Sequence, residues 1–291
     1  MSTRVGVTRS HAVTVWAVSV LLALCSSVLW GTSDFVAGLT AKRLPAAAVV
    51  GWSQLVGFLT LSVVVVVGPG LAPGPWPVWA VASGVAGAVA IASFYAALST
   101  GTMSIVAPVA ALGAAVPVLL GVATGDSPSA LGWAGMAVAV IGTVLASGPE
   151  IRAGLSARPV VLAGVAALGF GCVLFTMDRG ARISLVSTLW GMRLTSLLLY
   201  AAVALTRRSL GGVARRDLPT LVFVGLADLG ANALFVAAST QGLVSVAAVL
   251  GSLYPVVTII LARAVLGERL RAIQNAGILL ALVGVIALAA G

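Results

Sequence analysis

The sequence predicts an all-α, polytopic membrane protein with ten transmembrane helices arranged as two inverted five-helix repeats. Three observations predict it: the composition, the spacing of the apolar runs and an internal repeat. Apolar residues make up 60% of the 291 residues and charged residues only 8%, whereas soluble domains carry about 25% charged residues. With a mean hydropathy of +1.17, the chain lacks the polar side chains needed to cover a water-exposed surface, so lipid is the expected solvent.

Apolar runs follow one another along the whole chain, separated by short polar or Pro/Gly-rich breaks. A helix needs about 20 mostly apolar residues to cross the hydrocarbon core. On that criterion we expect spans at 14–37, 46–67, 77–99, 103–123, 130–147, 159–178, 184–206, 219–239, 243–264 and 272–290.

An internal repeat relates the two halves of the chain. Gly101-Thr102-Met103-Ser104 matches Gly242-Leu243-Val244-Ser245, and, with a shift of one residue, Gly125-Asp126 matches Gly267-Glu268. Five spans in each half are an odd number, so the second half enters the membrane in the opposite sense, which is the inverted repeat of many secondary transporters. The expected repeats are residues 13–147 and 159–290.

Two stretches resemble a known family. The stretch from Gly251 to Thr258, followed by Leu266-Gly267-Glu268-Arg269-Leu270 and Gln274, resembles the second repeat of EamA-type transporters of the drug/metabolite transporter superfamily. Trp30-Gly31-Thr32-Ser33-Asp34-Phe35 resembles the first-helix motif of that family. The resemblance covers 14–290 and implies ten helices, transport of small metabolites that is often outward, and a multi-pass place in the cell membrane, expected to be the cytoplasmic membrane of a bacterium. The family often has an arginine in its second helix, where this chain has Trp52-Ser53-Gln54.

The side of the membrane that the termini face is left open by the sequence. Basic residues concentrate in the loops that lie opposite the termini: Lys42, Arg43, Arg152, Arg158, Arg207, Arg208, Arg215, Arg216, Arg269 and Arg271. Because cytoplasmic loops carry an excess of lysine and arginine, the count places both termini outside. The family resemblance implies that both lie inside.

Two charged residues fall near the middle of expected spans, Arg193 in 184–206 and Asp228 in 219–239. Each costs about 2.5 to 3.5 kcal/mol at a helix centre, so we expect them to face the bundle interior and to pair, directly or through water. Three interpretations are open: the two residues form part of a substrate or coupling site, they only lock two helices together, or they make no contact. The residues that we expect to line a midplane substrate site are Arg193, Asp228, Asn232, Trp190, Tyr254, Ser252, Trp30, Gln54 and Tyr95.

Prolines inside two symmetry-related spans predict weak points in those helices. Pro255 should bend span nine or make it begin irregularly, since proline removes a backbone donor and clashes with the preceding turn. Pro108 and Pro117 give span four a comparable weakness. Interrupted helices in corresponding positions point to a substrate path, although kinks also serve packing. Gly267 is expected to end a helix and, with the residues after it, to form a solvated hinge.

Glycines repeat every seven residues in the last span of each half, at Gly135 and Gly142 and again at Gly277 and Gly284. Small residues let helix backbones approach closely. Helices five and ten should therefore pack through these faces, either against each other or against a second subunit in a homodimer.

The leading function is a secondary transporter, an exporter of small metabolites that works by alternating access. The alternative is a lipid-carrier flippase or a multidrug exporter of the same superfamily. An integral-membrane enzyme is disfavoured, because one histidine, two cysteines and seven dispersed acids offer no metal-binding cluster. We expect no metal and no cofactor, and no nucleotide-binding motif occurs. The expected partners are a small-molecule substrate and membrane lipid; nucleic acid is not expected despite the net charge of +9.

Overall fold

The computed structural model describes residues 3–100, 106, 109–147, 157–207, 212–267 and 269–290, apart from some side chains near the chain start and around residues 95–100. All regular elements in this part are helical. They are α1 (Thr3–Thr40), α2 (Ala46–Val67), α3 (Trp76–Thr100), a short 3-10 turn at Leu112–Ala114, α5 (Ala115–Ala123), α6 (Ala130–Ala146), α7 (Ala157–Arg207), a second 3-10 turn at Arg215–Asp217, α8 (Leu218–Gln241), α9 (Val244–Gly251), α10 (Tyr254–Leu266) and α11 (Ala272–Ala290).

Most expected spans coincide with these helices, and spans six, seven and nine differ in detail. The expected spans 159–178 and 184–206 are the two arms of α7, which is continuous except at Ser184, where φ is −160° and ψ is 116°. Span nine is divided into α9 and α10. Seven helical stretches are long and apolar enough to cross a membrane, one of them being the 50-residue stretch Ala157–Thr206, and two further apolar helices are shorter, Val109–Ala123 and Ala130–Ala146.

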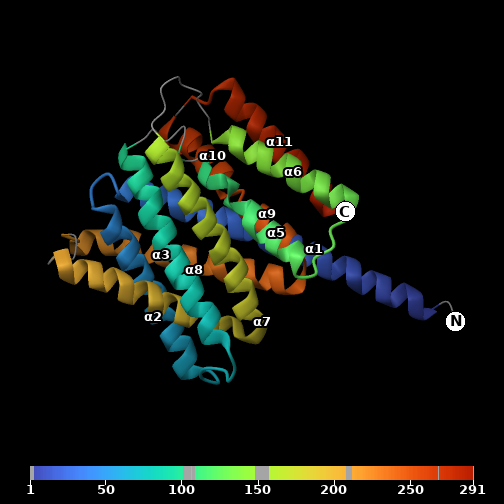
Figure 1. The fold of residues 1–291 in the computed structure, drawn as a ribbon, viewed down its shortest axis with the longest axis horizontal. Helices are drawn as coiled ribbons and strands as arrows, with labels where there is room; N and C mark the ends of the chain where they lie inside the picture. The colour runs from blue at the N-terminus through green and yellow to red at the C-terminus, as the bar shows by residue number, and fades with distance from the viewer. Residues whose placement is uncertain are drawn as a thin grey trace.

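The two ends of the bundle can be followed in Figure 1. The start of α1, the end of α11 and the turn between α8 and α9 at Gly242 lie at one end, which we call the terminal end. The connection from α1 to α2 lies at the opposite end, where Arg43 Nη1 binds Asp217 Oδ1 at 3.1 Å; we call it the Arg43 end. Side chains on the outer faces are apolar and exposed, for example Val66 at 83% and Leu205 at 77%, as lipid contact requires.

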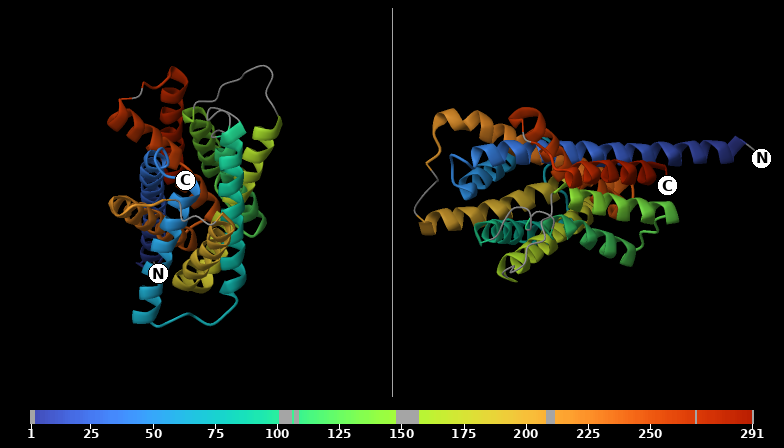
Figure 2. Two further views of the ribbon diagram at one scale, coloured as in Figure 1. Left: turned by 90° about the vertical axis from the view of Figure 1, so that its left-hand side faces the viewer. Right: turned by 90° about the horizontal axis from the view of Figure 1, so that it is seen from above.

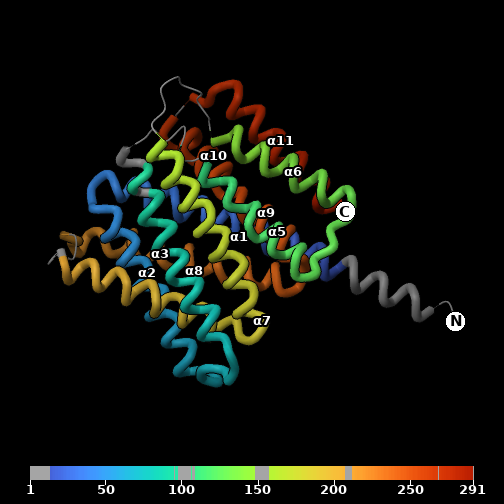
Figure 3. Tube along the Cα trace, in the orientation of Figure 1, coloured from blue at the N-terminus to red at the C-terminus, as the bar shows by residue number. Residues whose placement is uncertain are grey.

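Helices from different halves of the chain pack side by side, as the trace in Figure 3 shows for α1 with α8 and for α6 with α11. The α1–α8 contact is held by three serine hydroxyls at seven-residue spacing. Ser19, Ser26 and Ser33 of α1 donate to the carbonyl oxygens of Ala238, Ala231 and Val224 at 2.8, 2.8 and 3.1 Å. A seven-residue spacing keeps the donors on one helix face, so this series fixes the register of the two antiparallel helices.

The repeated glycines of α6 and α11 face each other. A Cβ on Gly142 would lie 2.3 Å from the backbone nitrogen of Ala281, and one on Gly277 would lie 2.1 Å from that of Ala146. The two helices are adjacent in every view (Figures 1 and 2). These faces therefore pack against each other within one chain.

Candidate functional site: a buried ion pair between the two halves

Arg193 and Asp228 form an ion pair in the interior of the bundle. Arg193 lies in the second arm of α7 with 1% of its side chain exposed, and its Nη1 is 2.7 Å from Asp228 Oδ2 of α8. The pairing predicted from the sequence is confirmed. Asp228 keeps 26% of its side chain exposed, so the carboxylate, unlike the guanidinium, is reachable from outside the protein packing.

A third helix completes the binding of Arg193. Gln54 of α2 accepts a hydrogen bond from the same Nη1 at 2.7 Å. One turn further along α2 stands Gly57, where a Cβ would lie 3.2 Å from Arg193 Nε and 3.3 Å from its Cδ. The absence of a side chain at Gly57 thus makes room for the guanidinium against the α2 backbone. In this way α2 from the first half and α7 and α8 from the second half meet at one charged group.

Asn232 orients the carboxylate from its own helix. Its Nδ2 donates to the backbone carbonyl of Asp228 at 2.6 Å and to Asp228 Oδ1 at 3.3 Å. The four-residue spacing that predicted a shared helix face is therefore correct. With Arg193 on Oδ2 and Asn232 on Oδ1, the Asp228 carboxylate is held in one orientation.

Trp190 lies on the α2 side of the site but does not contact the ion pair through its polar atom. Its Nε1 donates to Ser62 Oγ at 3.0 Å, and its ring centroid is 5.6 Å from that of Phe58. Trp190 is thus fixed against α2, one turn of α7 away from Arg193.

The α1 side of the site is formed by Trp30 and Asp34, which are four residues apart and share a helix face. Trp30 packs against Phe235 with centroids 5.8 Å apart. Asp34 is exposed and lies within electrostatic range of Asp228, which is a like charge, and of Tyr254. Within the described part of the chain, Asp34 has no hydrogen bond or ion pair, whereas Asp126, Asp178, Asp217 and Asp228 each have one.

Asp34 was missed as a site residue because it lies near the end of its expected span. The hydrogen bond from the Ser33 hydroxyl to the Val224 carbonyl gives the position of Asp34, the next residue on α1, along the axis of α8. Asp228 is four residues beyond Val224 in one direction and Asp34 is one residue beyond Ser33 in the other, so Asp34 lies about 7.5 Å nearer the Arg43 end than Asp228. The sequence feature that could have identified Asp34 is its four-residue spacing from Trp30, which places both side chains on one helix face.

The break in span nine lies just before Pro255. Helix α9 ends at Gly251, Ser252 and Leu253 form a turn, and Pro255 stands in the first turn of α10, where a missing N–H costs least. The predicted irregular start is confirmed. Ser252 Oγ donates to the carbonyl of Ala248 at 2.6 Å, and Tyr254 lies beside α1, its carbonyl 2.6 Å from where a Cβ on Gly31 would be.

The remaining expected positions are partly outside the described residues. Pro117 stands in the first turns of α5, directly after the 3-10 turn Leu112–Ala114, so an irregular helix start is present there. Gly267 ends α10 with φ +67°, which confirms its role as a helix-ending glycine. Pro108 and the side chain of Tyr95 lie outside the part that the structure describes. Among the described residues no group of three or more His, Cys, Asp or Glu is placed to hold a metal ion.

Together these observations define a class: a multi-pass helical membrane protein with a buried, charged site where its two halves meet. The sequence profile of the EamA-like transporter family matches residues 17–148 and again 157–290. The chain therefore belongs to the EamA-like transporter family, with two copies of the repeat, and is a membrane protein of the drug/metabolite transporter superfamily.

Comparison with solved structures supports the fold. A structure titled only "Crystal structure of protein" superposes with a TM-score of 0.78 at 19% sequence identity, and the match covers 92% of this chain and 95% of the other. In all, 26 solved chains match. A search of curated proteins finds no match.

Proposed function

We propose that this protein is a secondary transporter that exports a small metabolite by alternating access, with ten spans in two inverted repeats and its substrate site beside the Arg193–Asp228 pair. The observation that supports this most is that one guanidinium, 1% exposed, is bound by helices of both halves. A charge at that depth is expensive in lipid and is typical of substrate or ion pathways. Because both halves bind Arg193, a movement of one half relative to the other would change the contacts of its guanidinium.

The charges of the site favour a substrate with a positively charged group. Arg193 and Asp228 neutralise each other, whereas the exposed carboxyl group of Asp34 has no hydrogen-bond or ion-pair partner among the described residues. Trp30, on the same face of α1, offers an aromatic ring that attracts cations. The ammonium group of a small amine or amino-group-bearing metabolite would bind both the Asp34 carboxyl group and the Trp30 ring. The neighbouring Arg193–Asp228 pair would bind polar groups elsewhere on the same molecule.

The substrate can be found with a deletion strain, by comparing amine-bearing metabolites accumulated in the medium with and without the protein. The site is then tested in proteoliposomes with the metabolite so identified. Asp34→Asn should reduce transport at least tenfold without loss of thermal stability, because Asp34 has no hydrogen bond or ion pair to lose among the described residues. Asp217→Asn is the matched control, since Asp217 binds Arg43 and the Ala214 N–H away from the site. Equal transport by the Asp34→Asn variant and the wild type would reject the proposed substrate site.

A further inference from the structure

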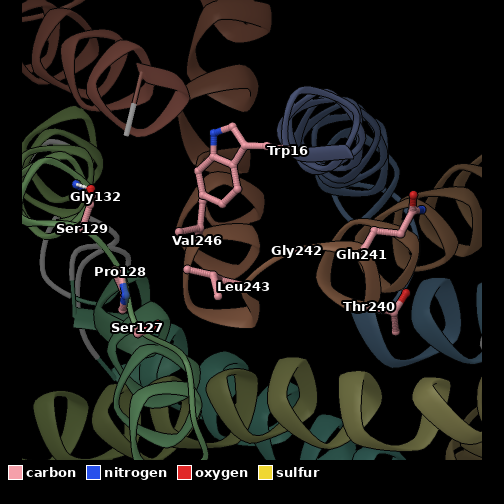
Figure 4. A pocket seen from close by; sticks show the side chains of 10 residues that line it. All are labelled: Trp16, Ser127, Pro128, Ser129, Gly132, Thr240, Gln241, Gly242, Leu243 and Val246. Atoms are coloured by element: carbon pink, nitrogen blue, oxygen red, sulfur yellow. Dashed lines mark hydrogen bonds between the residues drawn. The ribbon is translucent and has the colours of Figure 1, made fainter. Parts of the chain in front are cut away.

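A cavity lies at the terminal end of the bundle, away from the ion pair. It is an open cleft of about 510 Å³ between α1, the loop from α5 to α6, and the turn from α8 to α9. Small-molecule sites commonly have volumes of about 300–1,000 Å³. The residues that line it are Trp16, Ser127, Pro128, Ser129, Gly132, Thr240, Gln241, Gly242, Leu243 and Val246 (Figure 4).

The lining is amphipathic and carries no charged side chain. Figure 4 shows the indole of Trp16 extending from α1 over Leu243 and Val246, with Ser127 and Ser129 on one side and Thr240 and Gln241 on the other. The flat indole and the aliphatic side chains suit a flat apolar ligand body, and the hydroxyls of Ser127 and Ser129 suit a polar, uncharged substituent. Thr240 and Gln241 already donate to the Val236 and Ala237 carbonyls of their own helix. A charged ligand would lose its hydration here without finding a counter-charge in the lining.

Trp16 also has an unsatisfied donor. Its Nε1 is buried and has no hydrogen-bond acceptor in the described structure, although buried indole N–H groups usually find one. A ligand oxygen in the cleft would supply that acceptor once the indole ring turns its buried N–H toward the ligand. The lining therefore favours ligands that carry a carbonyl or similar oxygen.

Both repeats contribute walls to the cleft, and a hydrogen bond connects the two walls. Asp126, directly before Ser127, accepts a hydrogen bond through Oδ2 from the backbone N–H of Ser245 at 2.8 Å. Ser245 in turn lies between the lining residues Leu243 and Val246. The cleft has this shape only while the α5–α6 loop of the first repeat and the start of α9 in the second repeat stay together.

Buried packing separates the cleft from the ion-pair site. Trp16 and Trp30 are 14 residues apart on α1, about 21 Å along the helix. Between them, on the same face, Val20, Ala23 and Ser27 are 5%, 0% and 2% exposed. A ligand in the cleft would thus occupy a site distinct from the one that contains Arg193.

We infer that this cleft is a second small-molecule site, which takes an uncharged, flat, amphipathic ligand with a hydrogen-bond acceptor and, by contacting both repeats, stabilises the arrangement seen here. A ligand that binds one conformation better than the others shifts the population toward it. Its occupancy should therefore slow turnover, a consequence that rests on the proposed function.

Three probes of nearly the same shape and different charge test the site: para-fluorobenzamide, para-fluorobenzamidine and para-fluorobenzoate. Fluorine NMR line broadening with the full-length protein in nanodiscs, corrected with protein-free nanodiscs, measures binding of each. Saturable binding of the neutral amide, at least tenfold tighter than that of either charged probe, is expected. Equal binding of all three, or no binding above the lipid blank, would overturn the inference.

Two tryptophan variants locate the binding. Trp16→Phe keeps most of the ring and removes the N–H, and should weaken amide binding about fivefold, the usual effect of one uncharged hydrogen bond. Trp133→Phe is the control, because Trp133 is 44% exposed on the neighbouring α6 and does not line the cleft. Equal losses in both variants, or no loss in Trp16→Phe, would contradict a site at Trp16.

The effect on turnover is measured separately, by the rate of transport in proteoliposomes at saturating amide. A lower maximal rate with an unchanged substrate KM is expected from a site outside the substrate path. Competition with substrate instead would place the probe in the ion-pair site and refute a second site. Absence of any transport in untreated vesicles would count against the proposed function and leave the NMR result for the cleft standing on its own.

Discussion

Replacing Asp228 by asparagine removes the charge that compensates Arg193 while leaving the volume of the side chain almost unchanged. The backbone bond from Asn232 at 2.6 Å remains, and the guanidinium keeps only uncharged acceptors, Gln54 Oε1 and the amide oxygen of the new asparagine. Arg193 is 1% exposed, so water cannot take over the lost interaction.

The expected cost follows from the burial of the two groups. Removing one partner of a fully buried pair costs about 3–5 kcal/mol, because a charge is left uncompensated. Asp228 is 26% exposed and asparagine retains a dipole, so we expect a smaller loss, about 2–3 kcal/mol. On the scaling for large domains this corresponds to a fall in Tm of roughly 5 °C.

The assay is thermal unfolding of the purified protein in one detergent, run as a double-mutant cycle with Arg193→Gln. Because the double variant leaves no uncompensated charge, it should recover at least half of the stability lost by Asp228→Asn. Transport should remain absent in the double variant if the pair also serves the substrate. A double variant that is no more stable than Asp228→Asn alone would refute the electrostatic reasoning. Full transport by the double variant would show that the ion pair serves only to hold the two helices together.

Two further changes test the packing. Gly277→Ala places a Cβ 2.1 Å from the backbone nitrogen of Ala146 and should sharply reduce the yield of monodisperse protein in size-exclusion chromatography, while Gly164→Ala, with nothing within 4 Å, should leave it unchanged; similar yields would disprove the close α6–α11 contact. Pro255→Ala should change the free energy of unfolding by less than about 1 kcal/mol, because a first-turn proline costs the helix little; a large gain in a thermal-unfolding measurement would show that the proline itself causes the break after α9.

The helices were predictable because each depends on a local property of the chain. Ala46–Val67 and Ala272–Ala290 begin and end at the predicted residues, since a run of apolar side chains of the right length is sufficient to place a helix in lipid. The break between the two arms of α7 was also visible in the sequence. The form of this break, two helical arms that meet directly at the extended residue Ser184, depends on how the arms pack and was not visible in the sequence.

The candidate site was predictable in part. An arginine and an aspartate at similar depth have strong reason to pair, which gave Arg193 and Asp228. The sequence also proposed Gln54 without assigning its role as a second acceptor for Arg193. Gly57 and Asp34 were not identified, because their roles depend on the rotation of α2 and α1 about their axes.

The sequence by itself determined that the chain is a membrane protein, which segments form its helices and that its halves repeat. It also determined that Arg193 and Asp228 have reason to pair. These conclusions follow from the free-energy cost of placing polar groups in hydrocarbon, because that cost applies to each segment separately. Only the tertiary structure decided that the glycine faces of α6 and α11 meet within one chain, that Asp34 comes within electrostatic range of Asp228, and that Trp16 borders a cleft between the repeats. Those outcomes depend on the register and rotation of packed helices, which are fixed by contacts between residues far apart in the sequence.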